Sequence, residues 1–84
     1  MIINTDDQGS QLPINRVHRH FKGKYYYVFA LAKHTETEEL MVVYQALYGS
    51  HQIFVRPYNM FIEEVPEGKE NPTGQRYRFE PCQL

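Results

Sequence analysis

The YYYVFALA run at residues 25–32 constrains the fold more than any other stretch of the sequence. It is aromatic and β-branched, a composition that is typical of strands. Successive residues of a strand point to opposite faces, and here both alternating sets are apolar. We therefore predict a strand that is covered on both faces, or that turns one face toward a ligand or a partner.

Residues 40–48 (LMVVYQALY) allow two interpretations. Thr35 and Glu38 have the spacing of a helix capping box, and Gly49 stands where a helix would end. Against a helix, residues 41–44 are strongly β-prone and the apolar residues alternate along the segment. On balance the pattern favours a strand, followed by a tight turn at Gly49.

The remaining elements are short. Residues 53–56 form a predicted strand that Pro57 ends, and residues 57–61 suit a single helical turn, because proline is tolerated at its first position. Residues 66–75 have a loop composition, and residues 76–79 form a predicted edge strand. We expect a flexible arm at residues 1–15, one mainly β domain at residues 16–80 and a tail at residues 81–84. A chain of 84 residues allows one small domain.

Composition limits the classes of function. The formal net charge of -1 argues against a protein that coats nucleic acid over its whole surface. The single cysteine, Cys82, cannot form an internal disulfide, which suits a reducing compartment. No apolar run reaches the ~20 residues of a membrane span, and the acidic N-terminus lacks the features of a signal peptide. We expect a cytoplasmic protein that does not contact a membrane and needs no cofactor.

Several short strings in the chain resemble those of a known family. They are HFKG at residues 20–23, AKHTE at 32–36, YQALYG at 44–49, and VRP followed by MF within 55–61. Together they resemble a family of small bacterial proteins catalogued as domain of unknown function 1653. The resemblance covers about residues 18–65. It implies a small SH3-like β barrel of about five strands, with a strand at residues 40–48, and it brings no established activity.

The basic residues of the first half form a segment without acidic interruption. Residues 16–33 contain no Asp or Glu, and their basic members are Arg16, Arg19, Lys22, Lys24 and Lys33. Such a run can be an ordinary solvated face. Interleaved with tyrosines, it also offers phosphate contacts beside stacking surfaces. The candidate partners are single-stranded nucleic acid, an anionic small molecule or a peptide.

Metal binding and catalysis have weaker sequence support. The pairs His18 with His20 and His34 with Glu36 are the candidate metal ligands, but neither has a standard zinc spacing and no cysteine supports them. We therefore predict no metal site, with the histidines on the surface. An enzymic alternative uses His20, His34, Glu36 and Arg56 on a phosphate-containing or other anionic substrate.

We interpret the chain as a non-catalytic binding module, with an interaction subunit of a larger assembly as a further alternative. Turns near Glu36 and Gly49 would align Phe29, Tyr44 and Arg56 in one row across three strands. This row predicts an aromatic floor with Arg56 at its rim, suited to an anionic or planar group. Alternatively, Arg56 pairs with Glu36 or caps the helical turn. The candidate ligand-binding residues are His20, Lys22, Lys24, Tyr25, His34, Tyr44, Tyr48 and Arg56.

Overall fold

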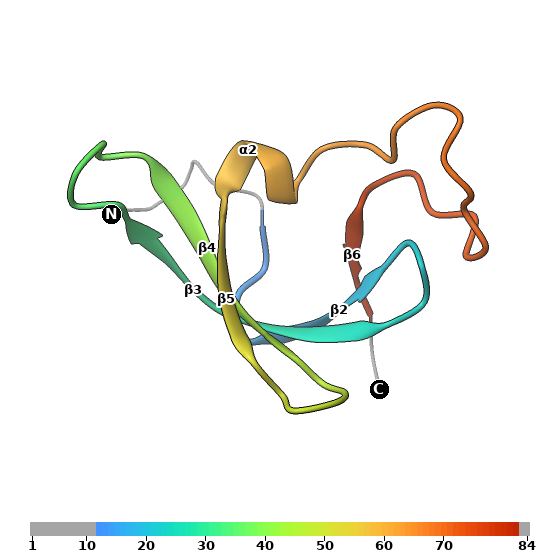
Figure 1. The fold of residues 1–84 in the computed structure, drawn as a ribbon, viewed down its shortest axis with the longest axis horizontal. Coiled ribbons are helices and arrows are strands. Elements are labelled where there is room, and N and C mark those ends of the chain that lie inside the picture. The colour runs from blue at the N-terminus through green and yellow to red at the C-terminus, as the bar shows by residue number, and fades with distance from the viewer. Residues whose placement is uncertain (1–11, 83–84) are drawn as a thin grey trace.

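The structure, a computed structural model, describes residues 12–82 as one antiparallel sheet of five strands with one short helix (Figure 1). The strand order is β5-β4-β3-β2-β6. The elements are β2 (Arg16–His20), β3 (Tyr25–Lys33), β4 (Leu40–Ala46), β5 (Ile53–Pro57), α2 (Tyr58–Phe61) and β6 (Phe79–Pro81). The sheet curls without closing, since its two outer strands, β5 and β6, do not pair with each other in residues 12–82 (Figure 1).

The mainly β prediction is confirmed, including the strand over residues 40–48 and the helical turn near residues 57–61. Two details differ. The strand predicted at residues 76–79 is β6, which begins only at Phe79, and Tyr77 contributes an isolated bridge to Glu64. Strand β2 lies inside the sheet, between β3 and β6, where the sequence had indicated only a charged segment. Its charged and histidine residues hid the strand from a pattern of apolar alternation.

A β-bulge interrupts the pairing of β3 with β4 at Phe29. Val28 lies opposite Tyr44, whereas Ala30 lies opposite Val43, so Phe29 has no partner in the register. The extra residue shifts the alternation of β3 by one place, so that Val28 and Leu31 both face the inside of the curled sheet. Phe29 itself points outward, with its ring against that of Tyr27 at 5.1 Å.

Aromatic rings fill the inside of the sheet. Phe61, from α2, is fully buried and stacks on Phe79, with ring centroids 4.0 Å apart and planes inclined by 4°. Tyr44 contacts both rings edge-on. Val28 and Val42 complete the buried cluster. Because α2 supplies Phe61 to the space between the two outer strands, this single turn of helix covers part of the open side of the sheet.

His18 is buried, contrary to the expected surface position. His18 and His20 both lie on the inner face, because alternate residues of strand β2 share one face of the sheet. The His18 side chain is fully excluded from solvent, and its Nδ1–H donates to the carbonyl of Arg16 at 3.3 Å. Burial lowers the pKa of His18, so the ring is held neutral.

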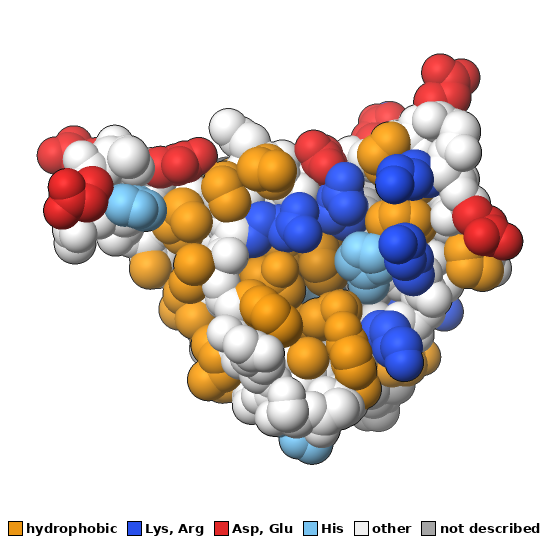
Figure 2. Space-filling view, viewed as in Figure 1, with side chains coloured by type: hydrophobic (Ala, Val, Ile, Leu, Met, Phe, Trp, Pro, Cys, Tyr) orange, Lys and Arg blue, Asp and Glu red, His pale blue; other side chains and the backbone are white. Residues whose placement is uncertain are grey.

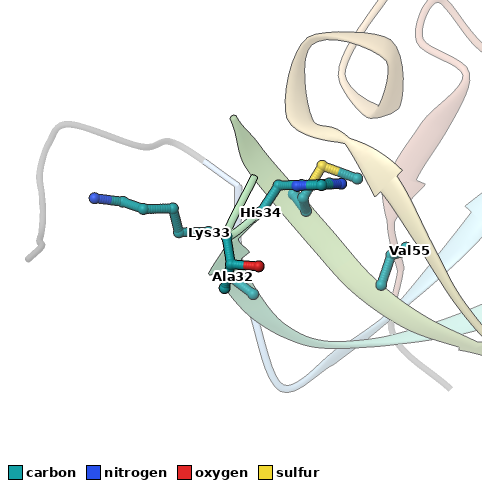
Figure 3. A pocket seen from close by; sticks show the side chains of 6 residues that line it. Ala32, Lys33, His34 and Val55 are labelled. Carbon is teal, nitrogen blue, oxygen red and sulfur yellow. The ribbon is translucent and has the colours of Figure 1, made fainter. Parts of the chain in front are cut away.

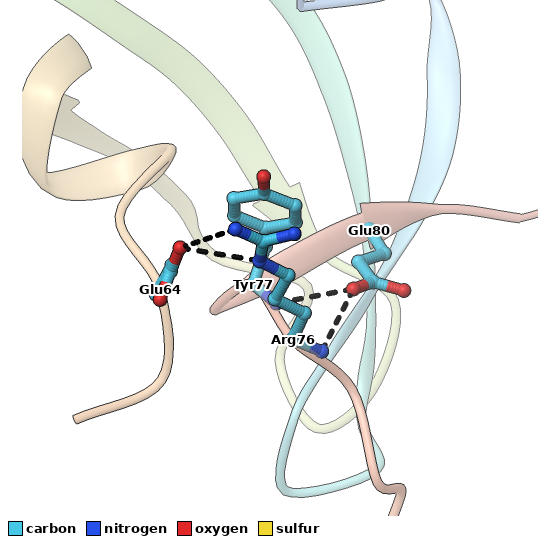
Figure 4. Close-up of polar contacts among 4 residues, drawn as sticks. All are labelled: Glu64, Arg76, Tyr77 and Glu80. Carbon is cyan, nitrogen blue, oxygen red and sulfur yellow. Dashed lines mark hydrogen bonds and ion pairs between the residues drawn. The ribbon is translucent and has the colours of Figure 1, made fainter. Parts of the chain in front are cut away.

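Gln75 fastens the long loop before β6 onto β2. Its side-chain amide donates to the carbonyl oxygens of Arg19 and Tyr77 at 2.9 and 3.2 Å, and its Oε1 accepts from Arg19 Nε at 2.7 Å. Nearby, Arg76 donates twice to Glu64, and Glu80 accepts the backbone N–H groups of Arg76 and Tyr77 (Figure 4). These bonds fix the chain on both sides of Arg78.

Candidate functional site

Basic side chains and a histidine gather over the opening between β5 and β6, beside hydrophobic side chains (Figure 2). We call this surface the open face. It comprises His20, Lys22, Lys24, Tyr48, Phe54, Arg56 and Arg78. These residues come from four different parts of the chain, which the curl of the sheet brings together (Figure 1).

Arg56 reaches the open face because β5 is in register with β4. Phe54 lies opposite Tyr44, and Arg56 lies opposite Val42, so both β5 side chains point to the inner side of the sheet. Arg56 Nε donates to the Tyr44 hydroxyl at 3.3 Å. In residues 12–82 Arg56 has no ion pair, with Glu36 or with any other carboxylate. No side chain caps α2, so both structural alternatives for this arginine are wrong.

Phe29, Tyr44 and Arg56 do not form the predicted row, because the register differs. The prediction that Tyr44 and Arg56 share one face of the sheet is nevertheless right. Tyr44 has Val28 and Phe54 as its neighbours, because the bulge removes Phe29 from the ladder and the β4–β5 pairing is displaced by two residues. A displacement of two residues leaves each side chain on its original face. Arg56 and Tyr44 therefore still share the inner face, while Phe29 lies on the outer one.

The aromatic floor of the open face is built on Tyr26. Its ring meets those of Tyr44 and Tyr48 edge-on at 5.6 and 5.5 Å, and its hydroxyl is hydrogen-bonded to that of Tyr48. Burial, followed by this hydrogen bond, raises the pKa of Tyr26. Phe54 packs on Tyr44 at 5.6 Å. Tyr44 is only 6% exposed, whereas Tyr48 and Phe54 are each 37% exposed, so the latter two rings can meet a ligand.

His20 is a neutral hydrogen-bond donor beside the cations of the open face. Its Nδ1 accepts the backbone N–H of Lys22 at 3.1 Å, which places the ring proton on Nε2. Partial burial, and then the charges of Arg78, Lys22 and Arg56, lower the pKa of His20 to about 4. A neutral ring near three cations can donate to an anion without adding to their repulsion.

The β2–β3 turn and the loop before β6 supply the remaining cations. Gly23, with a φ of 106°, allows the tight turn that carries Lys22 and Lys24, and the Lys24 ammonium lies 4.8 Å from the centre of the Tyr48 ring. Arg78 lies over the ring of Phe21 and pairs with Glu63. In the described chain the ion pairs are Arg76 with Glu64 and Arg78 with Glu63. The lysines of the turn thus have no carboxylate partner among residues 12–82.

Six of the eight predicted site residues belong to the open face or the floor beneath it. They are His20, Lys22, Lys24, Tyr44, Tyr48 and Arg56. Tyr25 does not belong to the open face. It lies opposite Arg19 in the β2–β3 pairing, so its side chain points to the outer face. The sequence interpretation missed Tyr26, Phe54 and Arg78. Alternation could have identified Phe54, which lies two residues from Arg56, but Arg78 has no local sequence signal.

His34 lies at the opposite end of β3 from His20, in the β3–β4 loop. Its Nδ1 accepts the backbone N–H groups of Glu36 and Thr37 at 3.1 and 3.4 Å, which orders the loop. At about 3.3 Å per residue, the length of β3 separates it from the β2–β3 turn by roughly 25 Å. His34 and Glu36 are therefore not brought to His20. No group of three potential metal ligands is found in residues 12–82.

A shallow hollow of ≈ 270 Å³ lies beside His34 (Figure 3). Ala32, Met41 and Val55 give it apolar walls, and Lys33 and Thr35 complete its lining. A second hollow of ≈ 360 Å³, mostly apolar, lies between α2 and β6. Neither contains the arginines of the open face, so neither joins the site described above.

The sequence profile of one family, described as a protein of unknown function (DUF1653), matches residues 16–81. The chain belongs to this family. A crystal structure of a family member from Bordetella bronchiseptica is 33% identical, with a TM-score of 0.67 over 83% of this chain and 87% of that chain. The resemblance expected from the HFKG and YQALYG strings is thereby confirmed. A comparison with curated proteins finds no match. None of the helices in residues 12–82 is long and apolar enough to cross a membrane.

Proposed function

We propose that this member of the DUF1653 family is a non-catalytic binding module whose open face holds an anionic group. One observation carries the proposal: Arg56 is held by the Tyr44 hydroxyl without a carboxylate partner among the described residues, on the same face as His20, whose pKa is lowered by burial and by the charges of Arg78, Lys22 and Arg56. Only Arg78 has a carboxylate partner among the described residues. Gathering cations without matching carboxylates costs stability, and such an arrangement is typical of sites that bind an anion.

The chemistry of the site suits a carboxylate or a phosphate. Arg56 uses Nε to hold the Tyr44 hydroxyl, and its two terminal amino groups remain for two oxygens of a ligand. His20 Nε2–H supplies a neutral donor, and the exposed parts of Phe54 and Tyr48 offer apolar contact for the body of the ligand. Lys22 and Lys24, both exposed, would add longer-range attraction that salt weakens.

The separation of His34 and Glu36 from His20 gives no support to the four-residue enzymic alternative. The setting that we propose is the reducing bacterial cytoplasm, which Cys82, a free thiol, and the Bordetella bronchiseptica relative both suit. In that setting the partners would be soluble anionic molecules, and no membrane contact is needed.

A titration with inorganic phosphate, followed by amide resonances in two-dimensional NMR at low salt, tests the proposal. We expect shifts at Phe54 and Arg56 and weakening as salt is raised. Arg56→Lys keeps the charge and loses the fork, so affinity should fall about fivefold or more. Arg16→Lys, on an exposed residue at the start of β2, is the matched control. Binding that is absent at low salt, or equal in the two variants, would refute the proposed site.

A further inference from the structure

β5 is an outer strand of the sheet, and half of its backbone has no partner within residues 12–82. The N–H of Ala46 donates to the carbonyl of Gln52 at 3.0 Å, which fixes the phase of the β4–β5 ladder. In an antiparallel pair, hydrogen-bonded and non-hydrogen-bonded residues alternate. Phe54 and Arg56 therefore bond to β4, and the N–H and C=O groups of Ile53 and Val55 point outward from the sheet.

Among the devices that usually protect an outer strand, β5 has a proline at its end. Natural edge strands carry lysines, bulges or prolines that prevent further pairing. Here Ile53 and Val55 are apolar and are 57% and 62% exposed, and the ladder of β4 with β5 runs without a bulge. Pro57, which has no N–H, limits the edge only at its end. Backbone groups and apolar side chains are thus presented together to an incoming strand.

The two sides of the edge differ in chemistry. Ile53 and Val55 project outward, beside Val43 of β4. Phe54 and Arg56 project inward, to the open face, where Arg56 and the lysines have no carboxylate partner in the part of the chain that the structure describes. A strand that paired with β5 would place alternate side chains on these two sides. Apolar residues would lie beside Ile53 and Val55, and acidic residues beside Arg56.

We propose that β5 accepts an extended acidic segment of a partner protein as an additional strand, with apolar and acidic residues in alternation. The proposal rests on the proposed function, because the acidic residues would be the anionic groups held by Arg56. The Ile53 and Val55 backbone groups supply the hydrogen bonds, and the charge of the open face selects the acid.

Two other occupants fit less well. A second copy of this chain would bring its own Arg56 to the same positive surface, with no acid in β5 to balance it. Single-stranded nucleic acid needs open ring faces for its bases. Tyr44 is buried, Tyr26 is partly buried and the Lys24 ammonium lies over Tyr48, so stacking of a base on the floor is least hindered at Phe54.

The test uses a probe peptide of alternating valine and aspartate, and a second peptide with asparagine in place of aspartate. Two further versions are N-methylated at alternate residues, one on each edge of the extended peptide. We expect the aspartate peptide to bind and to slow amide hydrogen exchange at Ile53 and Val55. Methylation of the edge that faces β5 should weaken it by roughly 10- to 30-fold, the loss of about two backbone hydrogen bonds, and methylation of the other edge should not.

The outcomes separate this inference from the proposed function. Phosphate binding through Arg56 without peptide binding, or peptide binding with unchanged exchange at Ile53 and Val55, overturns strand addition and leaves the anion site standing. Equal affinity of the asparagine peptide overturns the acidic preference. A dimer in sedimentation that Val55→Lys dissociates makes a second copy the occupant, and tighter binding of an oligothymidylate than of the peptide makes it nucleic acid. Absence of any anion binding removes both proposals.

Discussion

Stability should fall between pH 7 and pH 5 because His20 is held neutral in the fold. Its pKa is about 4 in the folded protein and 6.5 in a solvated chain. Below pH 6.5 the unfolded chain therefore binds more protons than the folded one, so acid favours unfolding. With these two pKa values, protonation of His20 in the unfolded chain lowers the free energy of unfolding at pH 5 by about 2 kcal/mol. Because the ring is partly exposed, we expect a smaller loss of about 1–2 kcal/mol.

Urea denaturation at several pH values measures this loss, with His20→Asn as the test variant. Asparagine can still accept the Lys22 N–H but cannot be protonated in this range. The buried His18 contributes a loss of the same sign, because burial also lowers its pKa, and it is present in both proteins. His51→Asn is the control, since His51 is exposed and has a φ of 56°, which asparagine tolerates. Parallel pH profiles for the wild type and His20→Asn would refute the reasoning.

Three other expectations concern the fold. Phe61→Ala should lower the free energy of unfolding by about 3–5 kcal/mol, because Phe61 is fully buried against Phe79, and a loss under about 1 kcal/mol would place the ring outside the core. In the free protein, amide exchange at Ile53 and Val55 should be faster than at Phe54. Uniform protection would contradict the assignment of outward-pointing N–H groups to Ile53 and Val55. Far-ultraviolet circular dichroism should show β structure with little helix, and a spectrum with about a third helix would contradict the sheet.

Three strands could be predicted from sequence because their signals are local. β3, β4 and β5 carry β-branched and aromatic residues in short runs bounded by turns, and alternation separates strand from helix at residues 40–48. β2 could not, since Arg16, His18 and His20 give no apolar alternation. Its position depends on pairing with β3 on one side and β6 on the other, and burial of His18 follows from that pairing.

The open face could be predicted in part for a related reason. A turn assumed near Gly49 fixes the pairing of the two strands beside it closely enough to place Arg56 and Tyr48 on the face of Tyr44. Arg78 arrives through the loop that Gln75 holds to β2 by hydrogen bonds between residues 56 positions apart, and such contacts leave no local pattern. Tyr26 was not singled out among three consecutive tyrosines. The bulge changes which alternate residues of β3 face inward, so simple alternation does not identify the inner side chains.

The bulge at Phe29 gives β3 one residue more than regular pairing requires. Without that residue, Val28 and Leu31 would be separated by a single position and would still share a face in strict alternation. Deletion of Phe29 should therefore preserve which side chains enter the core. What the deletion removes is bend, because bulges increase local twist and curvature. We therefore expect deletion of Phe29 to change the opening between β5 and β6 while the composition of the core stays the same.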